Sequence, residues 1–307
     1  MRIFEYLLTG AAVALGCFPA YAQKPNAIFY RASVSNDQQL AAKGNLSAHM
    51  RLGYRYLTGS TGAVDTQQAA QHFAAVANSG SSAASAWLGY SYVTAPELGH
   101  HASDGIAMIR KASGTGDPVA QTVLGHVLDW GIGVPTDHAT ARTLFAAAAP
   151  KFALAQRYLG ESYLRSKSRS DLAAAATWLG SASALGDRSA MLDLAGMYAQ
   201  RLGQPQSIKA ALYWLRKAAE TNDPAAIFQQ GYFYRHVPGK LANPKKAIAL
   251  YTSAATAGYV PAQSALGMCY AKGLGVPQNT QEAIKWLSMA APKSSFAAKQ
   301  LAILRGH

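Results

Sequence analysis

Residues 262–291, AQSALGMCYAKGLGVPQNTQEAIKWLSMAA, contain one complete copy of the unit from which this 307-residue chain is built. Ala262, Leu266 and Tyr270 stand four residues apart, so their side chains share one face of a helix. A short stretch with two glycines and a proline follows, which indicates a tight connection. The copy closes with the second helical pattern A-x-x-W-x-x-x-A-A. This stretch therefore predicts two helices joined by a turn.

The first half of the unit recurs along the chain at a nearly constant spacing. An alanine stands four residues before the leucine position in all seven copies, and a tyrosine stands four residues after it in six of them. The successive spacings are 36, 36, 35, 35, 36 and 36 residues. The leucine position is occupied by Leu52, Leu88, Leu124, Leu159, Leu194, Gln230 and Leu266. A period of this length is typical of stacked helix pairs.

The turns and the second helices repeat as well. We expect left-handed helix ends at Gly80, Gly116, Gly186, Asn222 and Gly258. Asp117-Pro118 and Asp223-Pro224 have the composition of helix starts. The tryptophan slot of the second helix holds His72, Met108, Leu144, Trp178, Trp214, Leu250 and Trp286. We expect this slot to be core, except at His72, which we expect to be partly exposed or locally bonded.

The combined pattern A-x-x-x-L-G-x-x-Y, G-x-G-V and A-x-x-W-x-x-x-A-A resembles the Sel1-like repeat, a relative of the tetratricopeptide repeat. The resemblance implies an all-α protein, a right-handed α-α superhelix (solenoid) of about seven helix pairs. The expected repeats are 48–83, 84–119, 120–154, 155–189, 190–225, 226–261 and 262–295. A partial repeat at 23–47 and a helix at 296–307 are expected to cap the ends. Distorted loops are expected near Pro96 and Pro238.

The first 22 residues resemble a secretory signal. Leu7 to Phe18 are largely apolar, and Ala20-Tyr21-Ala22 is a cleavage pattern. We expect cleavage after Ala22 and a periplasmic or secreted protein without a transmembrane segment. A lipoprotein signal at Cys17 is the alternative. Cleavage leaves Cys269 alone, so no intramolecular disulfide can form, and we expect it to be a small core residue.

The resemblance also implies which side chains could bind a partner, because the first helix of each tetratricopeptide-like pair lines the concave side. Stacked pairs form an extended groove that suits a peptide segment or another domain. The groove positions carry Tyr54, Tyr90, His126, Asp129, Trp130, Arg157, Glu161, Arg165, Tyr232, Arg235, His236 and Lys272. Tyr, Trp and Arg are common anchors of interfaces. The alternative interpretation is that some tyrosines only pack against adjacent repeats.

Positive charge is concentrated in the second half of the chain. Residues 24–150 hold 8 Lys/Arg and 7 Asp/Glu, a net charge of +1, whereas residues 151–307 hold 19 and 7, a net charge of +12. Such asymmetry indicates acidic partners, and export argues against nucleic acid. The alternative is that the lysines only solvate outer helix faces.

The sequence does not indicate catalysis. It contains no H-E-x-x-H, C-x-x-C or G-x-S-x-G motif. The adjacent His100 and His101 diverge on a regular element, and His126 with Asp129 would supply only two metal ligands. We expect no enzyme activity, no cofactor and no metal. The prediction is a protein-protein interaction scaffold or adaptor of the bacterial cell envelope, in signalling, secretion or exopolysaccharide machinery, or in host interaction. The alternative is binding of anionic polysaccharide or lipid head groups by the basic half.

Overall fold

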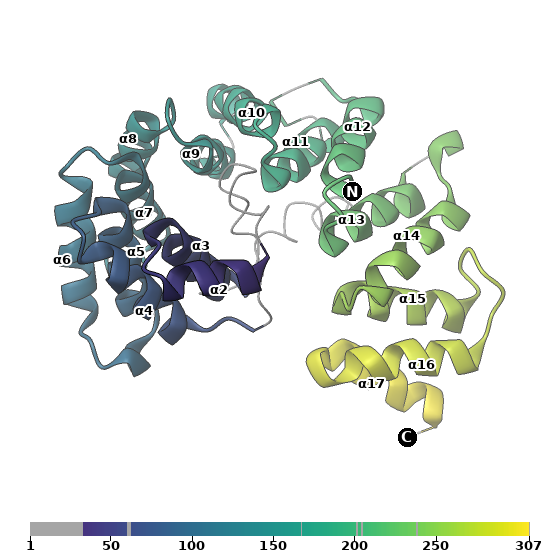
Figure 1. The fold of residues 1–307 in the computed structure, drawn as a ribbon. Helices are drawn as coiled ribbons and strands as arrows, with labels where there is room; N and C mark the ends of the chain where they lie inside the picture. The colour runs from purple at the N-terminus through teal and green to yellow at the C-terminus, as the bar shows by residue number, and fades with distance from the viewer. Residues whose placement is uncertain are drawn as a thin grey trace. The chain divides into compact units, whose positions relative to one another are not determined.

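The computed structural model describes residues 33–59, 63–166, 168–200, 202–203, 205–237 and 239–306. These residues form sixteen α-helices and three short 3-10 helices, without a β-strand among them. Figure 1 shows the helices following one another in pairs along the chain. The predicted all-α repeat architecture is confirmed. The predicted signal sequence, with Cys17, lies outside the described residues.

Seven helix pairs correspond to the seven copies of the sequence pattern, and each has a first and a second helix. The pairs are α3 (Leu46–Thr58) with α4 (Thr66–Ala77), α5 (Ser82–Thr94) with α6 (Ala102–Ser113), α7 (Pro118–Trp130) with α8 (His138–Ala148), α9 (Ala153–Ser166) with α10 (Arg169–Ala184), α11 (Arg188–Gln200) with α12 (Ile208–Ala219), α13 (Pro224–His236) with α14 (Pro244–Thr256), and α15 (Val260–Lys272) with α16 (Thr280–Ala290). Helix α2 (Val34–Ala42) precedes them and α17 (Ser295–Arg305) follows. Each first helix begins about two residues before the expected repeat boundary.

The described chain divides into two compact units. The N-terminal unit runs to Ala190, and the C-terminal unit begins at Met191. Consecutive helices pack on one another within each unit. Short 3-10 helices, η2 (Pro96–Leu98) and η3 (Gly239–Leu241), replace the regular connection in the second and sixth pairs, where distorted loops were expected. A third, η4 (Ala291–Lys293), precedes α17.

The predicted helix ends are confirmed by the backbone. All five residues expected to be left-handed have positive φ, including Asn222 at 56°. Asp117 and Asp223 cap the following helices, because their carboxylates accept the backbone N–H groups of Ala120 and Ala226 at 2.8 Å and 3.0 Å. The turn chemistry in the sequence therefore sets where the helices start and stop.

The glycine after the repeat leucine lets the two helices of a pair approach closely. At Gly125, an added Cβ would lie 2.6 Å from Cε1 of Phe145, on the second helix of the same pair. The equivalent Gly267 would place a Cβ 2.7 Å from Cγ of Leu287. No Cβ fits at such distances without displacing a packed side chain, so the packing requires glycine at these two positions.

The core column of the second helix lies one residue later than the tryptophan slot. The side chains that follow the slot, among them Phe73, Phe145 and Leu215, are fully buried. The slot itself is half-buried in every pair, at Trp178 and Trp214 for instance, so the prediction that it is core was wrong by one position. The buried stripe is centred on the residue that faces the repeat glycine. His72 is half-buried as expected. Cys269 is buried, which confirms its place in the core.

Candidate interaction surface on the first helices

The twelve candidate groove residues fall into two sets, one in each unit. Eight lie in the N-terminal unit between Tyr54 and Arg165, and four lie in the C-terminal unit between Tyr232 and Lys272. Within a first helix, the position two residues after the repeat leucine and the position six residues after it behave differently. Side chains at the position two residues after the leucine pack against neighbouring side chains. The position six residues after the leucine lies in the last turn of the helix.

The position two residues after the leucine is mainly a packing position. Tyr90 is only 1% exposed, and its ring lies 6.1 Å from the ring of His126 in the next pair. Tyr54 makes an edge contact, at 5.2 Å between ring centroids, with Trp87 of the next pair. Burial raises the pKa of Tyr54 far above its ordinary value. These tyrosines join adjacent pairs, as the alternative interpretation of the sequence held.

His126 is enclosed by rings and cations. Its imidazole stacks on Tyr158 at 4.9 Å and lies 6.2 Å from the ring of Trp130. Burial, together with the charges of Arg157 and Arg165, lowers the pKa of His126 to about 3. The imidazole is therefore neutral near pH 7, which leaves an uncharged stacking partner inside the N-terminal unit.

Trp130 and Arg165 form the exposed part of this region. Both occupy the position six residues after the leucine, in adjacent pairs. The Trp130 side chain is 49% exposed, and the Arg165 guanidinium lies 4.9 Å from the centre of its ring. Such cation–π contacts are worth about 0.5–1 kcal/mol at exposed sites. The pair presents a flat aromatic surface and a cation together.

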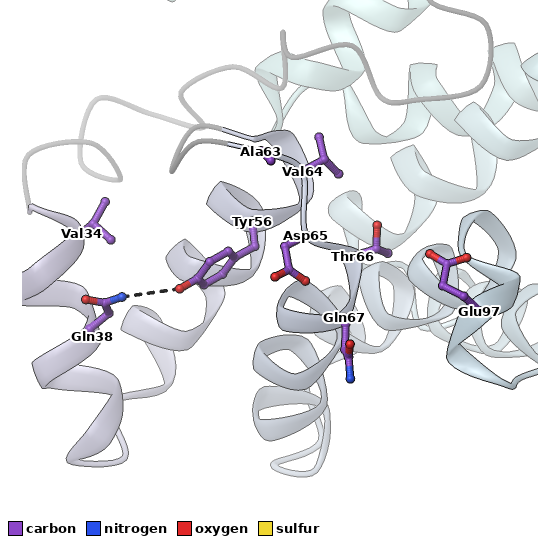
Figure 2. A pocket seen from close by; sticks show the side chains of 9 residues that line it. All are labelled: Val34, Gln38, Tyr56, Ala63, Val64, Asp65, Thr66, Gln67 and Glu97. Carbon is purple, nitrogen blue, oxygen red and sulfur yellow. Dashed lines mark hydrogen bonds between the residues drawn. The ribbon is translucent and has the colours of Figure 1, made fainter.

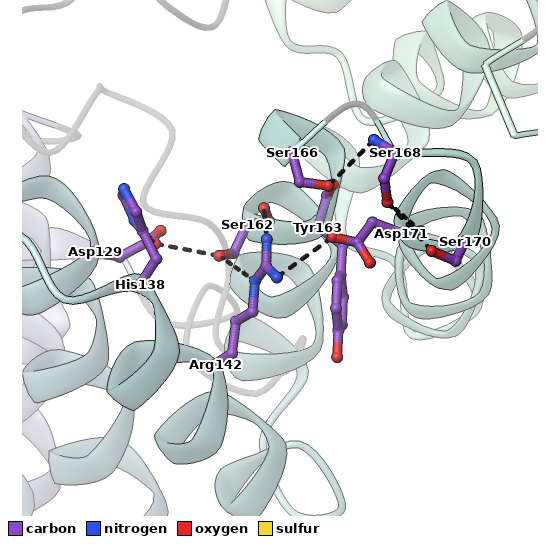
Figure 3. Close-up of polar contacts among 9 residues, drawn as sticks. All are labelled: Asp129, His138, Arg142, Ser162, Tyr163, Ser166, Ser168, Ser170 and Asp171. Atoms are coloured by element: carbon purple, nitrogen blue, oxygen red, sulfur yellow. Dashed lines mark hydrogen bonds and ion pairs between the residues drawn. The ribbon is translucent and has the colours of Figure 1, made fainter.

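A buried carboxylate fixes Arg165. Asp129 is 4% exposed and forms an ion pair with the Arg165 guanidinium. Its Oδ1 atom also accepts hydrogen bonds from His138 Nδ1 at 2.9 Å and from Ser162 Oγ at 3.1 Å (Figure 3). Because Asp129 has three partners, its charge is compensated despite burial. Asp129 thus acts on the surface indirectly, by holding the guanidinium in place.

Arg142 extends the polar network toward the next helix pair. Figure 3 shows its guanidinium between Ser162 and Asp171. It donates to Ser162 O at 2.9 Å and forms an ion pair with Asp171 Oδ2 at 3.4 Å. The network therefore joins α7, α8, α9 and α10.

Arg157 and Glu161 form a second charge cluster on α9. The Arg157 side chain is 4% exposed and pairs with Glu161 and, at 3.3 Å, with Asp187. Burial opposes the charge of Arg157, but the two carboxylates outweigh it and raise its pKa. Burial raises the pKa of Glu161, an effect that Arg157 opposes. This cluster joins α9 to the start of α11 and presents little free charge.

The four candidates of the C-terminal unit are more accessible. The rings of Tyr232 and His236 lie 4.1 Å apart, and His236 Nδ1 donates to the Tyr232 carbonyl at 2.8 Å. Arg235 Nη1 lies 3.4 Å from the buried Sγ of Cys269. Burial raises the pKa of this thiol and Arg235 opposes the change. Lys272 is exposed at the end of α15.

Two polar groups near the start of the described chain are absent from the candidates. His49 Nε2 faces the Ala41 carbonyl at 3.1 Å, so its Nδ1 accepts from His72 Nδ1 at 2.8 Å. Burial, together with His49, lowers the pKa of His72. Asp37 is fully buried between Arg51 and Arg55. No motif marked these groups, because their partners come from different helices.

A shallow hollow of about 610 Å³ lies near α2 and the connection between α3 and α4. In Figure 2, Tyr56 and Gln38 approach each other on one side, and Glu97 lies on the other. Gln38 Nε2 donates to the Tyr56 hydroxyl at 3.5 Å. The lining residues are Val34, Gln38, Tyr56, Ala63, Val64, Asp65, Thr66, Gln67 and Glu97. Its mixed lining contains no convergent set of reactive groups. Across the part of the chain that the structure describes, no three metal-ligating side chains converge.

Comparison with known proteins decides the family. The Sel1 repeat pattern matches residues 46–81, 118–149, 153–187, 188–223, 224–259 and 260–291. This chain belongs to the Sel1 repeat family. The pair α5 and α6 lies between the first two matched segments and forms the same helix pair. Sel1 repeat proteins are generally non-enzymatic scaffolds for protein-protein interaction.

The chain is also similar to solved structures and to a curated protein. A Sel1 repeat protein from Oxalobacter formigenes is similar over 88% of this chain and 80% of its own, with 26% identity and a TM-score of 0.61. A protective antigen of uropathogenic Escherichia coli with an SLR fold covers 89% of this chain and 67% of its own, at 25% identity and a TM-score of 0.40. Chitin synthase regulatory factor 3 of Schizosaccharomyces pombe is 32% identical over 110 residues, which are 34% of this chain and 11% of that protein. The chain thus spans about a tenth of that curated relative. In the described residues, no helix is both long and apolar enough to cross a bilayer.

Proposed function

We propose that this Sel1 repeat protein is an exported adaptor of the bacterial cell envelope that binds segments of partner proteins on the last turns of its first helices. The adaptor performs no catalysis and serves signalling, secretion or exopolysaccharide machinery, or host interaction. The observation that supports this most directly is the Trp130–Arg165 pair. It combines an exposed tryptophan with an arginine that a buried carboxylate already holds in place.

The pair has the properties of an interface anchor. Tryptophan and arginine are enriched among residues whose truncation weakens complexes by 2 kcal/mol or more. Because Asp129 fixes Arg165, little side-chain freedom is lost when a partner binds, and preorganisation of this kind strengthens binding. The buried candidates, among them Tyr90 and His126, would pack beneath this surface and would not contact the partner.

Replacing Trp130 tests the surface. The tagged full chain is used to capture proteins from envelope extract of the native host, and the captured proteins are identified by mass spectrometry. Trp130→Ala should weaken capture by about thirtyfold, which corresponds to about 2 kcal/mol. Leu185→Ala is the matched control. Leu185 is a 61% exposed apolar residue of the same unit, but it follows the second helix α10 and so lies outside the first-helix surface. Equal capture by wild type and Trp130→Ala would contradict the proposal.

The location is tested separately. Residues 1–22 are fused to a reporter that is active only outside the cytoplasm. Activity of the fusion, with cleavage directly after Ala22, would support export by signal cleavage. Retention in the cytoplasm would contradict it, and lipid attachment at Cys17 would favour the lipoprotein alternative.

A further inference from the structure

In the C-terminal unit, the second helices carry more positive charge than the first helices. Residues 191–307 hold 13 Lys/Arg and 4 Asp/Glu, which gives a net charge of +9. The first helices α13 and α15 carry only Arg235 and Lys272. The second helices α12, α14 and α16 carry Lys209, Arg216, Lys217, Lys245, Lys246 and Lys285. The charge is therefore concentrated away from the first-helix surface.

On α12, two cations flank an exposed aromatic ring. Lys209, Tyr213 and Arg216 are spaced four and three residues apart, so they share one face, and all three are exposed. Tyr213 is 47% exposed, and its ring makes an edge contact with Trp214 at 5.1 Å. This contact holds the tyrosine in position while leaving its other side open to solvent.

The next second helix, α14, also presents exposed cations. Lys245 stands 36 residues after Lys209, at the same position of the following repeat. Lys246 is exposed beside it, with its ammonium 4.5 Å from the ring centre of Tyr234. Farther along α14, the exposed residues are Ala249 and the hydroxyl-bearing Thr252, Ser253 and Thr256. Both helices pack on α13, and Lys209 and Lys245 occupy the same position of consecutive repeats.

Acidic side chains of the protein itself do not neutralise most of these cations. Lys217 pairs with Glu220 at 3.0 Å. Among the described residues, Lys209, Arg216 and Lys245 have no carboxylate within ion-pair distance. Lys209 and Lys245 also stand in first helical turns without an acidic residue, whereas the helix dipole favours acidic residues there. Helix stability thus gives no reason for their placement.

We propose that the second-helix face, formed by Lys209, Tyr213, Arg216, Lys245 and Lys246, binds a linear anionic polysaccharide that carries carboxylates. The cations would pair with the carboxylates, and the nearby hydroxyls would exchange hydrogen bonds with the sugar hydroxyls. This site is independent of the proposed adaptor surface.

The composition of the face favours a polysaccharide over other anionic partners. Protein interfaces have an apolar core, but Tyr213 is the only large apolar side chain exposed on α12 and α14. Membrane-surface helices insert several large apolar side chains, and this face offers none besides that tyrosine. A hydrated polymer with regularly spaced charges needs neither feature.

The test measures binding of the full chain to immobilised polygalacturonate at low salt, with dextran as the uncharged control. The site variant combines Lys209→Ser, Arg216→Ser, Lys245→Ser and Lys246→Ser. The matched variant removes four exposed cations elsewhere, with Arg110→Ser, Lys111→Ser, Lys293→Ser and Lys299→Ser. Both variants have the same net charge, and circular dichroism confirms that both remain helical.

The proposal expects binding to polygalacturonate, but not to dextran, that disappears in moderate salt. The site variant should bind about tenfold more weakly, since four exposed ion pairs are lost, and the matched variant should change less than about threefold. Equal weakening of both variants would overturn the proposal, because net charge alone would then explain the binding. Tighter binding to polyglutamate or to anionic phosphatidylglycerol vesicles, at equal charge, would also overturn it in favour of a protein or a membrane.

Discussion

Lowering the pH from 7 to 5 should destabilise the N-terminal unit through His126. The imidazole is 7% exposed, stacks on Tyr158, and lies near the guanidiniums of Arg157 and Arg165. Burial and these charges lower the pKa of His126 to about 3 in the folded protein. The unfolded chain, with an ordinary pKa of about 6.5, binds a proton at pH 5 that the folded state excludes.

The sign and size of the effect follow from this difference. The folded pKa lies below the unfolded one, so the contribution to stability is intact above pH 6.5 and falls as the pH decreases toward 3. Each pH unit in this range removes about 1.4 kcal/mol. At pH 5, about 1.5 units below the unfolded pKa, the loss is about 2 kcal/mol. This figure requires only that the folded pKa lie well below 5.

The assay is urea unfolding at pH 7 and pH 5, followed by circular dichroism. The wild type is compared with His126→Phe, which retains an aromatic ring for stacking but cannot bind a proton. The loss of unfolding free energy between the two pH values should be about 2 kcal/mol smaller in the variant. His101→Gln, which removes an exposed histidine, controls for the change in histidine number. If His126→Phe and the wild type lost equal stability, the burial argument for His126 would be refuted.

Four further substitutions test the packing, the buried carboxylate and a turn by urea unfolding. Gly125→Ala should destabilise by about 1–3 kcal/mol because its Cβ would overlap Phe145, whereas Gly180→Ala, which meets nothing within 4 Å, should stabilise by about 0.5–1 kcal/mol. The packing argument fails if both changes have the same sign. Asp129→Ala should destabilise by about 1.5–3 kcal/mol because three polar partners lose their acceptor. A neutral result there would mean that water replaces the carboxylate. Asn222→Gly should stabilise by about 0.5–1 kcal/mol, since φ is 56°, and a loss of stability would mean that the asparagine side chain stabilises the turn.

The helices and turns could be predicted from the sequence because their determinants are local. The Leu-Gly spacing, the capping aspartates and the left-handed residues each act within a few positions of the chain. Asn222 replaces glycine at one turn, and the turn still forms. The half-buried tryptophan slot was misjudged by one position because helical periodicity alone does not separate the centre of a buried stripe from its edge.

The candidate surface could be predicted only in part, because exposure depends on the neighbouring pair. Position within the helix did not reveal that Trp87 covers Tyr54 or that Tyr158 stacks on His126. Asp129 was selected as a possible contact residue, but its burial makes it a support for Arg165. His138 and Ser162 were missed because they are Asp129 partners contributed by other helices. Only the assembled pairs show these relationships.

The division between packing and surface positions in the first helices has a consequence for how recognition can change. The position two residues after the leucine is tied to the adjacent pair, whereas the position six residues after it holds Trp130, Arg165, His236 and Lys272 in different pairs. Within either unit, adjacent pairs thus present different side chains at this position, Trp130 and Arg165 in the N-terminal unit and His236 and Lys272 in the C-terminal unit. A partner lying across these helices would contact a short series of such residues, one in each repeat. New specificities could arise through single substitutions while the fold stays the same.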